Sequence, residues 1–325
     1  MPTSARGARG PRSTGPRVVA LGGGHGLAAS LRALRRVTDD VTAVVGVSDN
    51  GGSSGRLRRE FAVVPPGDLR MALAALCGDD SWGRTWSRVV QHRFSGDGEL
   101  AGHSLGNLLI TALWEETGDI VTGLDWVGAL LGAHGRVLPV ATVPLEVVAD
   151  VVGLRPEDPS LRERVVGQVQ VATTRGQVVD LRVEPADALA CPEAVEAITS
   201  ADTVLLGPGS WFTSVLAPLQ VRGIGTAVCE SPGKVVVVLN LAAQPGETDG
   251  FSPHRHLEVL HHQMPSLRVD TVLADPSTVT DVDALASAAA ALGARVALAP
   301  VASRDGSPRH DVDLLASALG GVLAD

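Results

Sequence analysis

Apolar runs that end in glycine-rich loops recur along this chain, and stretches with helical periodicity lie between them. The strand-like runs cover residues 18–21, 41–47, 203–206, 235–239 and 272–273, and the helical stretches cover residues 27–36, 68–77, 105–116, 193–200 and 281–292. Continuous apolar strands that alternate with helices are typical of parallel βαβ units, whose sheet is covered on both faces. The sequence therefore predicts an α/β fold built on an open parallel sheet.

Residues 136–184 have a different pattern, in which valine-rich alternation is interrupted by Gly and Pro. This alternation predicts a hairpin-rich, antiparallel segment at one edge of the same domain. Residues 82–94 and 119–132 are expected to be helices that cap or line a cleft. Residues 1–16, with arginines among Gly, Ser and Pro, are expected to be a disordered basic tail, and residues 17–325 to form a single domain.

Charge and composition exclude several classes of protein. The chain has 27 Lys and Arg against 36 Asp and Glu, a net charge of −9, which argues against nucleic acid as the partner. No stretch is long and apolar enough for a membrane span or a secretory signal peptide. The three cysteines, Cys77, Cys191 and Cys229, are widely spaced, which is typical of a reduced compartment. We therefore expect a cytoplasmic protein.

The loop after the first strand is rich in glycine and leads directly into a helical stretch. Glycines here let the backbone turn tightly and approach a phosphate, whose charge is met by N–H groups at the helix N-terminus. A subset of this loop fits the dinucleotide-binding pattern G-x-G-x-x-A, although a tight turn without a ligand remains the alternative. The candidate binding residues are Gly22, Gly23, Gly24, His25 and Gly26.

The loop after the second strand, SDNGGSSGR, offers hydroxyls, backbone N–H groups and a guanidinium, all suited to phosphate. Asp49 is available for a ligand hydroxyl or for Mg²⁺. A solvated connection is the alternative. No G-x-x-x-x-G-K-[ST] sequence occurs, so P-loop nucleotide hydrolysis is not expected. The candidate residues are Asn50, Gly51, Gly52, Ser53, Ser54 and Arg56.

A third loop follows the strand at residues 203–206, and its four residues, Gly207, Pro208, Gly209 and Ser210, are also candidates. Ligands of open parallel sheets bind beyond the carboxyl ends of the strands, so the three loops are expected to face one crevice. Two further polar segments lie near helix or strand ends: GHSLGN, with His103 and Asn107, and residues 244–248. His103 is a candidate general base or phosphate ligand, or a helix cap.

The remaining histidines gather at residues 254–262 on one expected helix with Glu258. Their spacing could assemble a metal site, but a solvated helix face is the commoner reason for such a cluster. No Gly-x-Ser-x-Gly sequence is present, so a nucleophile elbow is not expected.

The motifs GGGHG, SDNGGSSGRLR, PPGDLR, GHSLGN, GPGSWFTS and QPGETDG together resemble the CofD/YvcK family, in the family's order and over nearly the whole chain. The continuous SSGRLR, the residues 244–250 and the Arg309-His310-Asp311 sequence are closer to the YvcK branch, the gluconeogenesis factors, than to the transferase branch.

This resemblance implies a Rossmann-like domain and, for the YvcK branch, a cytoplasmic protein that binds UDP-sugars such as UDP-N-acetylglucosamine. Such a protein is needed for cell shape and wall synthesis during growth on gluconeogenic carbon, through an unknown protein partner, and a homodimer is expected by analogy. It also implies that the nucleotide end of the ligand lies at residues 22–26, the phosphates at residues 207–210 and 51–56, and Arg309 near the ligand. For the transferase branch it implies Mg²⁺-dependent transfer of a phospholactyl group to a deazaflavin.

Three functions are therefore compared. The first is a nucleotide-sugar-binding regulator, which needs no cofactor to bind its ligand. The second is a transferase of the 2-phospho-L-lactate type, in which Asp49 is the catalytic residue and Mg²⁺ ligand; Asn50, where the YvcK branch usually has a second Asp, weakens this reading. The third is a dehydrogenase, disfavoured because the GGSSGR loop would crowd an adenosine ribose. Arg56 is expected to contact phosphate rather than pair with Glu60.

Overall fold

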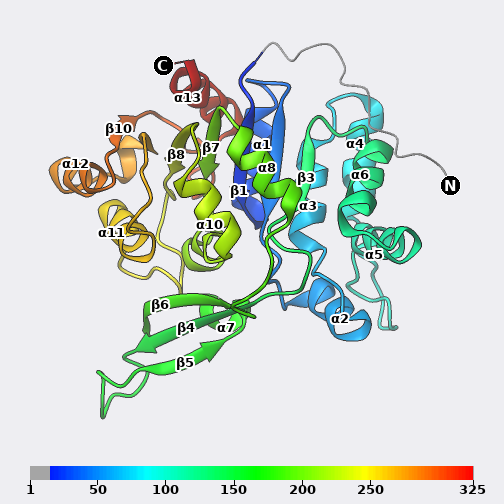
Figure 1. The fold of residues 1–325 in the computed structure, drawn as a ribbon, viewed down its shortest axis with the longest axis horizontal. Coiled ribbons are helices and arrows are strands. Elements are labelled where there is room, and N and C mark those ends of the chain that lie inside the picture. Colours follow the sequence, from blue (N-terminus) through cyan, green and yellow to red (C-terminus); the bar gives the residue numbers. More distant parts are fainter. Residues whose placement is uncertain (1–14, 325) are drawn as a thin grey trace.

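A computed structural model describes residues 15–324, and its centre is a seven-stranded sheet in which every neighbouring pair of strands is parallel. The strand order is β10-β9-β8-β7-β1-β2-β3 (Figure 1). From the centre of the sheet, β1 to β3 follow one another toward one edge and β7 to β10 toward the other, so the strand order reverses between β1 and β7, as in a Rossmann sheet. This topology confirms the predicted α/β class. The strands are β1 (Val18–Gly22), β2 (Val41–Val45), β3 (Arg136–Pro139), β7 (Thr203–Leu206), β8 (Lys234–Val238), β9 (Thr271–Ala274) and β10 (Arg295–Leu298).

Helices cover both faces of this sheet. The helices α1 (Gly24–Leu34), α3 (Gly67–Leu76) and α13 (Val312–Ala324) pack together on one face, with α4 (Ser81–Gln91), α5 (Leu105–Thr117) and α6 (Ile120–Leu131) beyond α3. The other face carries α8 (Pro192–Ser200), the π-helix η1 (Trp211–Leu216), α9 (Ala217–Leu219), α10 (Arg222–Cys229), α11 (Pro253–Gln263) and α12 (Val282–Ala291). A short 3₁₀ turn, η2 (Pro276–Thr278), follows β9. Because both faces are covered, all residues of β1, β7 and β9 are buried.

The hairpin prediction for residues 136–184 is correct only for the later part of that segment. The first part, β3, pairs in parallel with β2 and is an edge strand of the main sheet. The rest forms a separate antiparallel sheet in the order β5-β4-β6, of β4 (Glu146–Val152), β5 (Glu163–Val166) and β6 (Gln177–Glu184), with α7 (Gln168–Ala172). Bonds from Leu145 N–H to the Val47 carbonyl and from Ser48 to Gln168 hold this sheet at the carboxyl ends of the main strands (Figure 1).

The second glycine-rich segment is helical where a loop was expected. The helix α2 (Gly52–Phe61) begins inside the SDNGGSSGR motif, with Gly51 as its N-cap residue. Ser53, Ser54 and Arg56 are therefore presented by the first turns of a helix. Gly52 has a φ of +48°, a conformation that glycine adopts without the cost a Cβ would bring.

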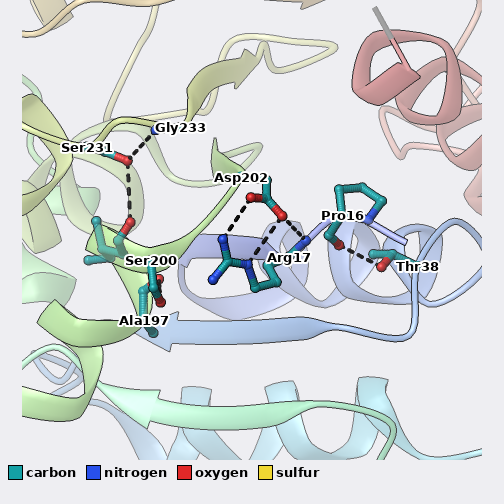
Figure 2. Close-up of polar contacts among 9 residues, drawn as sticks. Pro16, Arg17, Thr38, Ala197, Ser200, Asp202, Ser231 and Gly233 are labelled. Carbon is teal, nitrogen blue, oxygen red and sulfur yellow. Dashed lines mark hydrogen bonds and ion pairs between the residues drawn. The ribbon is translucent and has the colours of Figure 1, made fainter. Parts of the chain in front are cut away.

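The described chain is anchored where β1 begins. The backbone N–H and guanidinium of Arg17 donate to the carboxylate of Asp202, and Thr38 donates to the carbonyl of Pro16 (Figure 2). The expected basic tail lies, as far as residue 14, outside the described residues. Within the described part of the chain, no helix is both long and apolar enough to cross a bilayer.

Candidate functional site

The loops after β1 and β7 lie against each other at the point where the strand order reverses. A methyl group on Gly26 would overlap the carbonyl of Pro208 and lie only 2.7 Å from the Cα of Gly209. The first turn of α1 and the GPGS loop therefore touch backbone to backbone. Ligands of open α/β sheets bind at this switch point.

A pocket of about 420 Å³ opens beside this contact, and we call it the switch-point crevice. Its walls are α1, the GPGS loop, residues 240–245 and residues 308–310. Of the residues predicted from the sequence, it brings together His25, Gly26, Pro208, Gly209 and Arg309. Its volume falls in the range that small ligands occupy.

The crevice wall is cationic. Arg309 is exposed, and among the described residues its guanidinium bonds to Ser307 and, at 3.5 Å, to Asp305, so it can turn toward a ligand. Arg32 reaches the same crevice from the exposed side of α1. The first-turn N–H groups of α1, at His25 and Gly26, have no carbonyl four residues back inside the helix and carry partial positive charge. No Asp or Glu is among the residues that line this crevice.

The GPGS loop itself offers fewer donors than the sequence suggests. Gly209 N–H donates to Asn240 Oδ1 at 2.9 Å, and Trp211 N–H donates to Gln244. The N–H groups of Phe212 and Thr213, at the start of η1, donate to the carboxylate of Glu247 at 3.0 and 2.9 Å. Glu247 thus occupies the position that a phosphate was expected to take at this helix start.

The hydroxyl of Ser210 also bonds to Glu247. Burial raises the pKa of the Glu247 carboxyl, and these hydrogen bonds counteract the shift. Ser210 therefore supports the GPGS loop, while Pro208 and Gly209 form its crevice wall.

A buried polar cluster between α2 and α5 contains four of the other predicted residues: Ser53, Ser54, His103 and Asn107. The two serines lie about 50 residues before the other two in the sequence. Ser53 Oγ accepts from Ser104 N–H at 3.3 Å and from Asn107 Nδ2 at 3.0 Å. Its own O–H is then directed to His103 Nδ1, 3.0 Å away, which requires the His103 proton on Nε2. Ser54 lies 3.5 Å from the same Asn107 amide.

Two cations border this cluster. Asn107 Oδ1 accepts from the buried Arg70 at 2.9 Å. Burial lowers the pKa of His103, and the nearby Arg56 lowers it further, so the ring is neutral at pH 7. In the described part of the chain the His103 side chain caps no helix, and its bond to Ser53 holds the start of α2 against the start of α5.

Arg56 and Asn50 have partners that the sequence did not suggest. The Arg56 guanidinium donates to the carbonyls of Glu99 at 3.2 Å and Ala101 at 2.7 Å, and forms no ion pair with Glu60 in the described chain. The Asn50 amide bonds to Gln170 and to Val169 N–H, which ties the motif to α7. Asn50 therefore connects two elements at the position where the YvcK branch usually has a second Asp.

A second carboxylate is present nearby, at Asp68. An added Cβ on Gly67 would lie 3.0 Å from Asp49 Oδ2, so Asp49 borders the start of α3, whose next residue is Asp68. Burial, followed by the charge of Asp49, raises the pKa of Asp68 to about 7, against an opposing hydrogen bond from Gly24 N–H. Asp68 thus connects the first turn of α1 with Asp49 and the α2–α5 cluster.

This carboxylate pair fits Mg²⁺, which commonly takes one or two carboxylates and completes its shell with waters and ligand phosphates. Two like charges close together are costly without a cation. Within residues 15–324, no three His, Cys, Asp or Glu side chains lie close enough together to hold a metal ion. The cluster at residues 254–262 accordingly does not converge on one point: His256 is buried and packs edge-on against Trp211 at 5.0 Å.

Sequence reasoning missed Asp68, Arg32 and the capping role of Glu247. The PPGDLR motif places Asp68 in the first turn of a helix that begins just after two prolines, which was the available signal. Arg32 follows His25 by seven residues, the spacing that puts two side chains on one helix face.

The fold and the crevice define a Rossmann-type protein with a pocket at its switch point. Residues 18–301 match the family model described as 2-phospho-L-lactate transferase CofD. The chain belongs to this CofD family.

Its similar relatives carry the name of the other branch. A protein of Mycobacterium tuberculosis named "Putative gluconeogenesis factor" is 51% identical over 94% of this chain and 90% of its own length. The protein of Bacillus subtilis named "Gluconeogenesis factor" is 37% identical over 82% of this chain and 80% of its own. A crystal structure of a UPF0052 family member from Bacillus halodurans superposes with a TM-score of 0.84 at 30% identity, covering 96% of this chain and 99% of that one. The resemblance read from the six motifs is confirmed.

Proposed function

We propose that this protein is a regulator that binds a nucleotide-sugar of the UDP-N-acetylglucosamine type in the switch-point crevice. The observation that carries the proposal is the joining of the α1 N-terminus, the GPGS loop and Arg309 around one pocket at the reversal of strand order. A diphosphate there meets N–H groups, a helix dipole and guanidinium side chains.

The diphosphate is assigned to the α1 side of the crevice. The N–H groups of Gly209 and of residues 211–213 already have protein acceptors, so they are poor ligands for a further anion. His25, Gly26, Arg32 and Arg309 keep donors that face the crevice or its rim. This changes the expectation that residues 207–210 hold the phosphates, and keeps Pro208 and Gly209 as shape-forming contacts.

Binding without turnover is favoured by the lining of the crevice. Among the described residues no carboxylate lines it, and burial lowers the pKa of its His310 to about 4, so His310 has no carboxylate partner there for acid–base chemistry near neutral pH. The names of the similar relatives support a role on gluconeogenic carbon, and the motif resemblance adds cell shape and wall synthesis, exerted in the cytoplasm through a protein partner. A homodimer is part of the same proposal.

The test is isothermal titration with UDP-N-acetylglucosamine, in wild type, Arg309→Gln and the matched control Arg268→Gln. Arg268 is exposed on the β9 side and lines no part of the crevice. We expect Arg309→Gln to weaken binding about tenfold or more, as loss of a charge-assisted contact does, and the control to bind as wild type. No binding by wild type, with no thermal stabilisation at saturating ligand, would contradict the proposal, because a ligand held only by the folded state must raise stability.

A second candidate function rests on the Asp49 and Asp68 pair beside the crevice. In a transferase of the 2-phospho-L-lactate type, these carboxylates would hold Mg²⁺, which supplies charge neutralisation at the transferred phosphate. The phosphoanhydride bond of a nucleotide-activated donor would break, a phosphodiester to the acceptor hydroxyl would form, and a nucleoside monophosphate and the hydroxyl proton would be released. Mass spectrometry with a deazaflavin acceptor, for wild type and Asp49→Ala, tests this: product from wild type alone would make the protein an enzyme, and no product from either excludes this acceptor.

A further inference from the structure

Helix α1 carries a second cavity toward its C-terminal end, away from the glycine-rich turn. The cavity measures about 380 Å³ and lies between α1, the end of α3, α4 and the start of α13. Five arginines line it: Arg32, Arg35 and Arg36 from α1, and Arg84 and Arg88 from α4. We call it the arginine cavity.

The positive charge of this cavity is only partly neutralised by the protein. Arg35 pairs with Asp79 at 2.6 Å, and Arg36 pairs with Asp313. Within the described chain the other three arginines have no carboxylate partner, although Arg84 also donates to the Asp79 carbonyl. Five cations against two anions leave a local charge of +3, on a chain whose net charge is −9.

This arrangement is costly in the absence of an anion. Like charges around one concavity repel one another, and side chains over a shared hollow are less well solvated than side chains on a convex helix face. Partial burial, and after it the charge of Arg35, lower the pKa of the Arg32 guanidinium. An anion with several oxygens would relieve the repulsion and accept from several guanidinium groups together.

The shape of the cavity indicates the kind of anion. Residues from α1, α4 and the ends of α3 and α13 line this open hollow. A compact ligand inside it can contact arginines of α1 and α4 at the same time, whereas a flat membrane surface cannot enter it. No aromatic ring on which a base could stack is among the described lining residues, whose members other than the arginines are Ala74, Ala75, Cys77, Gly78, Asp79, Ser87 and Val312. A ligand that is mostly phosphate fits better than a nucleoside.

We propose that the arginine cavity is a second binding site, for a small metabolite that carries two or more phosphate groups. Arg32 and Val312 line both the arginine cavity and the switch-point crevice, so the two sites adjoin along α1. Arg32 lies seven residues, or about 10 Å along the helix axis, from His25 in the crevice. A ligand in the arginine cavity would therefore change the charge that Arg32 presents to the crevice, whatever ligand the crevice takes.

The test uses inorganic tripolyphosphate as the probe, titrated calorimetrically into the full chain at fixed ionic strength. The double variant Arg84→Gln/Arg88→Gln removes two exposed arginines that do not line the crevice. Arg309→Gln removes an arginine of the switch-point crevice. Arg268→Gln removes an exposed arginine that lines neither pocket. Melting curves confirm that each variant is folded.

We expect one tripolyphosphate per chain in wild type, affinity reduced at least tenfold in Arg84→Gln/Arg88→Gln, and wild-type affinity in the other two variants. Equal affinity in all four proteins, or no binding by wild type, would overturn the proposal. So would loss in Arg309→Gln alone, which would place the anion in the crevice. Flotation with phosphatidylglycerol vesicles separates the sources of phosphate: binding to vesicles without binding to free tripolyphosphate would assign the arginines to lipid headgroups instead.

Discussion

Replacing Gly26 by Ala tests the contact between the two loops that form the crevice. An ideal Cβ at Gly26 lies 2.6 Å from the carbonyl carbon of Pro208 and 2.7 Å from the Cα of Gly209. Both neighbours are backbone atoms, so no side-chain rotation relieves the overlap. One loop must move away from the other, and the crevice must widen or shift.

The magnitude follows from two opposing contributions. Forcing extra volume into a close-packed contact costs about 1–3 kcal/mol. Gly26 lies within α1, so Ala also gains up to about 1 kcal/mol of helix propensity. The expected net loss is up to about 2 kcal/mol, which for a domain of this size lowers the melting temperature by up to about 3 °C.

The matched control is Gly321→Ala, in α13, where an added Cβ meets nothing within 4 Å. It should keep or raise the melting temperature, since only the propensity gain applies. Melting curves and titration with UDP-N-acetylglucosamine are measured for both variants. If Gly26→Ala melts like Gly321→Ala and binds ligand like wild type, the two loops are not in contact and the crevice is wrongly built.

Three further variants test the polar network beside the crevice. Asp68→Asn should raise the melting temperature in EDTA much more at pH 8 than at pH 4. The pKa of the Asp68 carboxyl is about 7 in the folded state and near its ordinary value in the unfolded state, so wild type loses stability as the pH rises from about 4 to 7, and the neutral Asn removes this loss. An equal effect of the substitution at both pH values would contradict this. Arg56→Ala should lower the melting temperature of the unliganded protein, because two hydrogen bonds to the carbonyls of residues 99 and 101 are lost, and Arg56→Lys should lower it less. If Arg56→Ala instead weakens binding of UDP-N-acetylglucosamine at an unchanged melting temperature, Arg56 contacts phosphate. Ser53→Ala should cost about 1–3 kcal/mol in chemical denaturation by leaving buried donors of residues 104 and 107 unpaired, whereas the exposed Ser266→Ala should cost nothing measurable.

The main sheet could be predicted because its inner strands are mostly apolar, and because glycine ends or closely follows β1, β2 and β7. The two edge strands were harder. β3 begins at an exposed Arg136 and was grouped with the hairpins that follow it, and β10 is only partly buried along its four residues. Edge strands lack the continuous apolar signal of a strand with two neighbours and two covered faces.

Candidate residues could be predicted from the sequence where a loop directly follows a strand. Pairs of interacting side chains that lie far apart in the sequence could not be predicted. The GPGS loop was found, but nothing local shows that Glu247, 37 residues after Ser210, caps the next helix. The closeness of Asp49 and Asp68 likewise depends on how α3 packs beside the end of β2. Side-chain pairing across long sequence separations is set by the fold, and local pattern cannot supply it.

The central claim is that a nucleotide-sugar binds where β1 and β7 meet, and a crystal structure with UDP-N-acetylglucosamine tests it most directly. We predict difference density in the switch-point crevice, with diphosphate oxygens within hydrogen-bonding distance of the first turn of α1 and of Arg309. Density for the nucleotide outside this crevice, or a saturated crystal with none, would contradict the account.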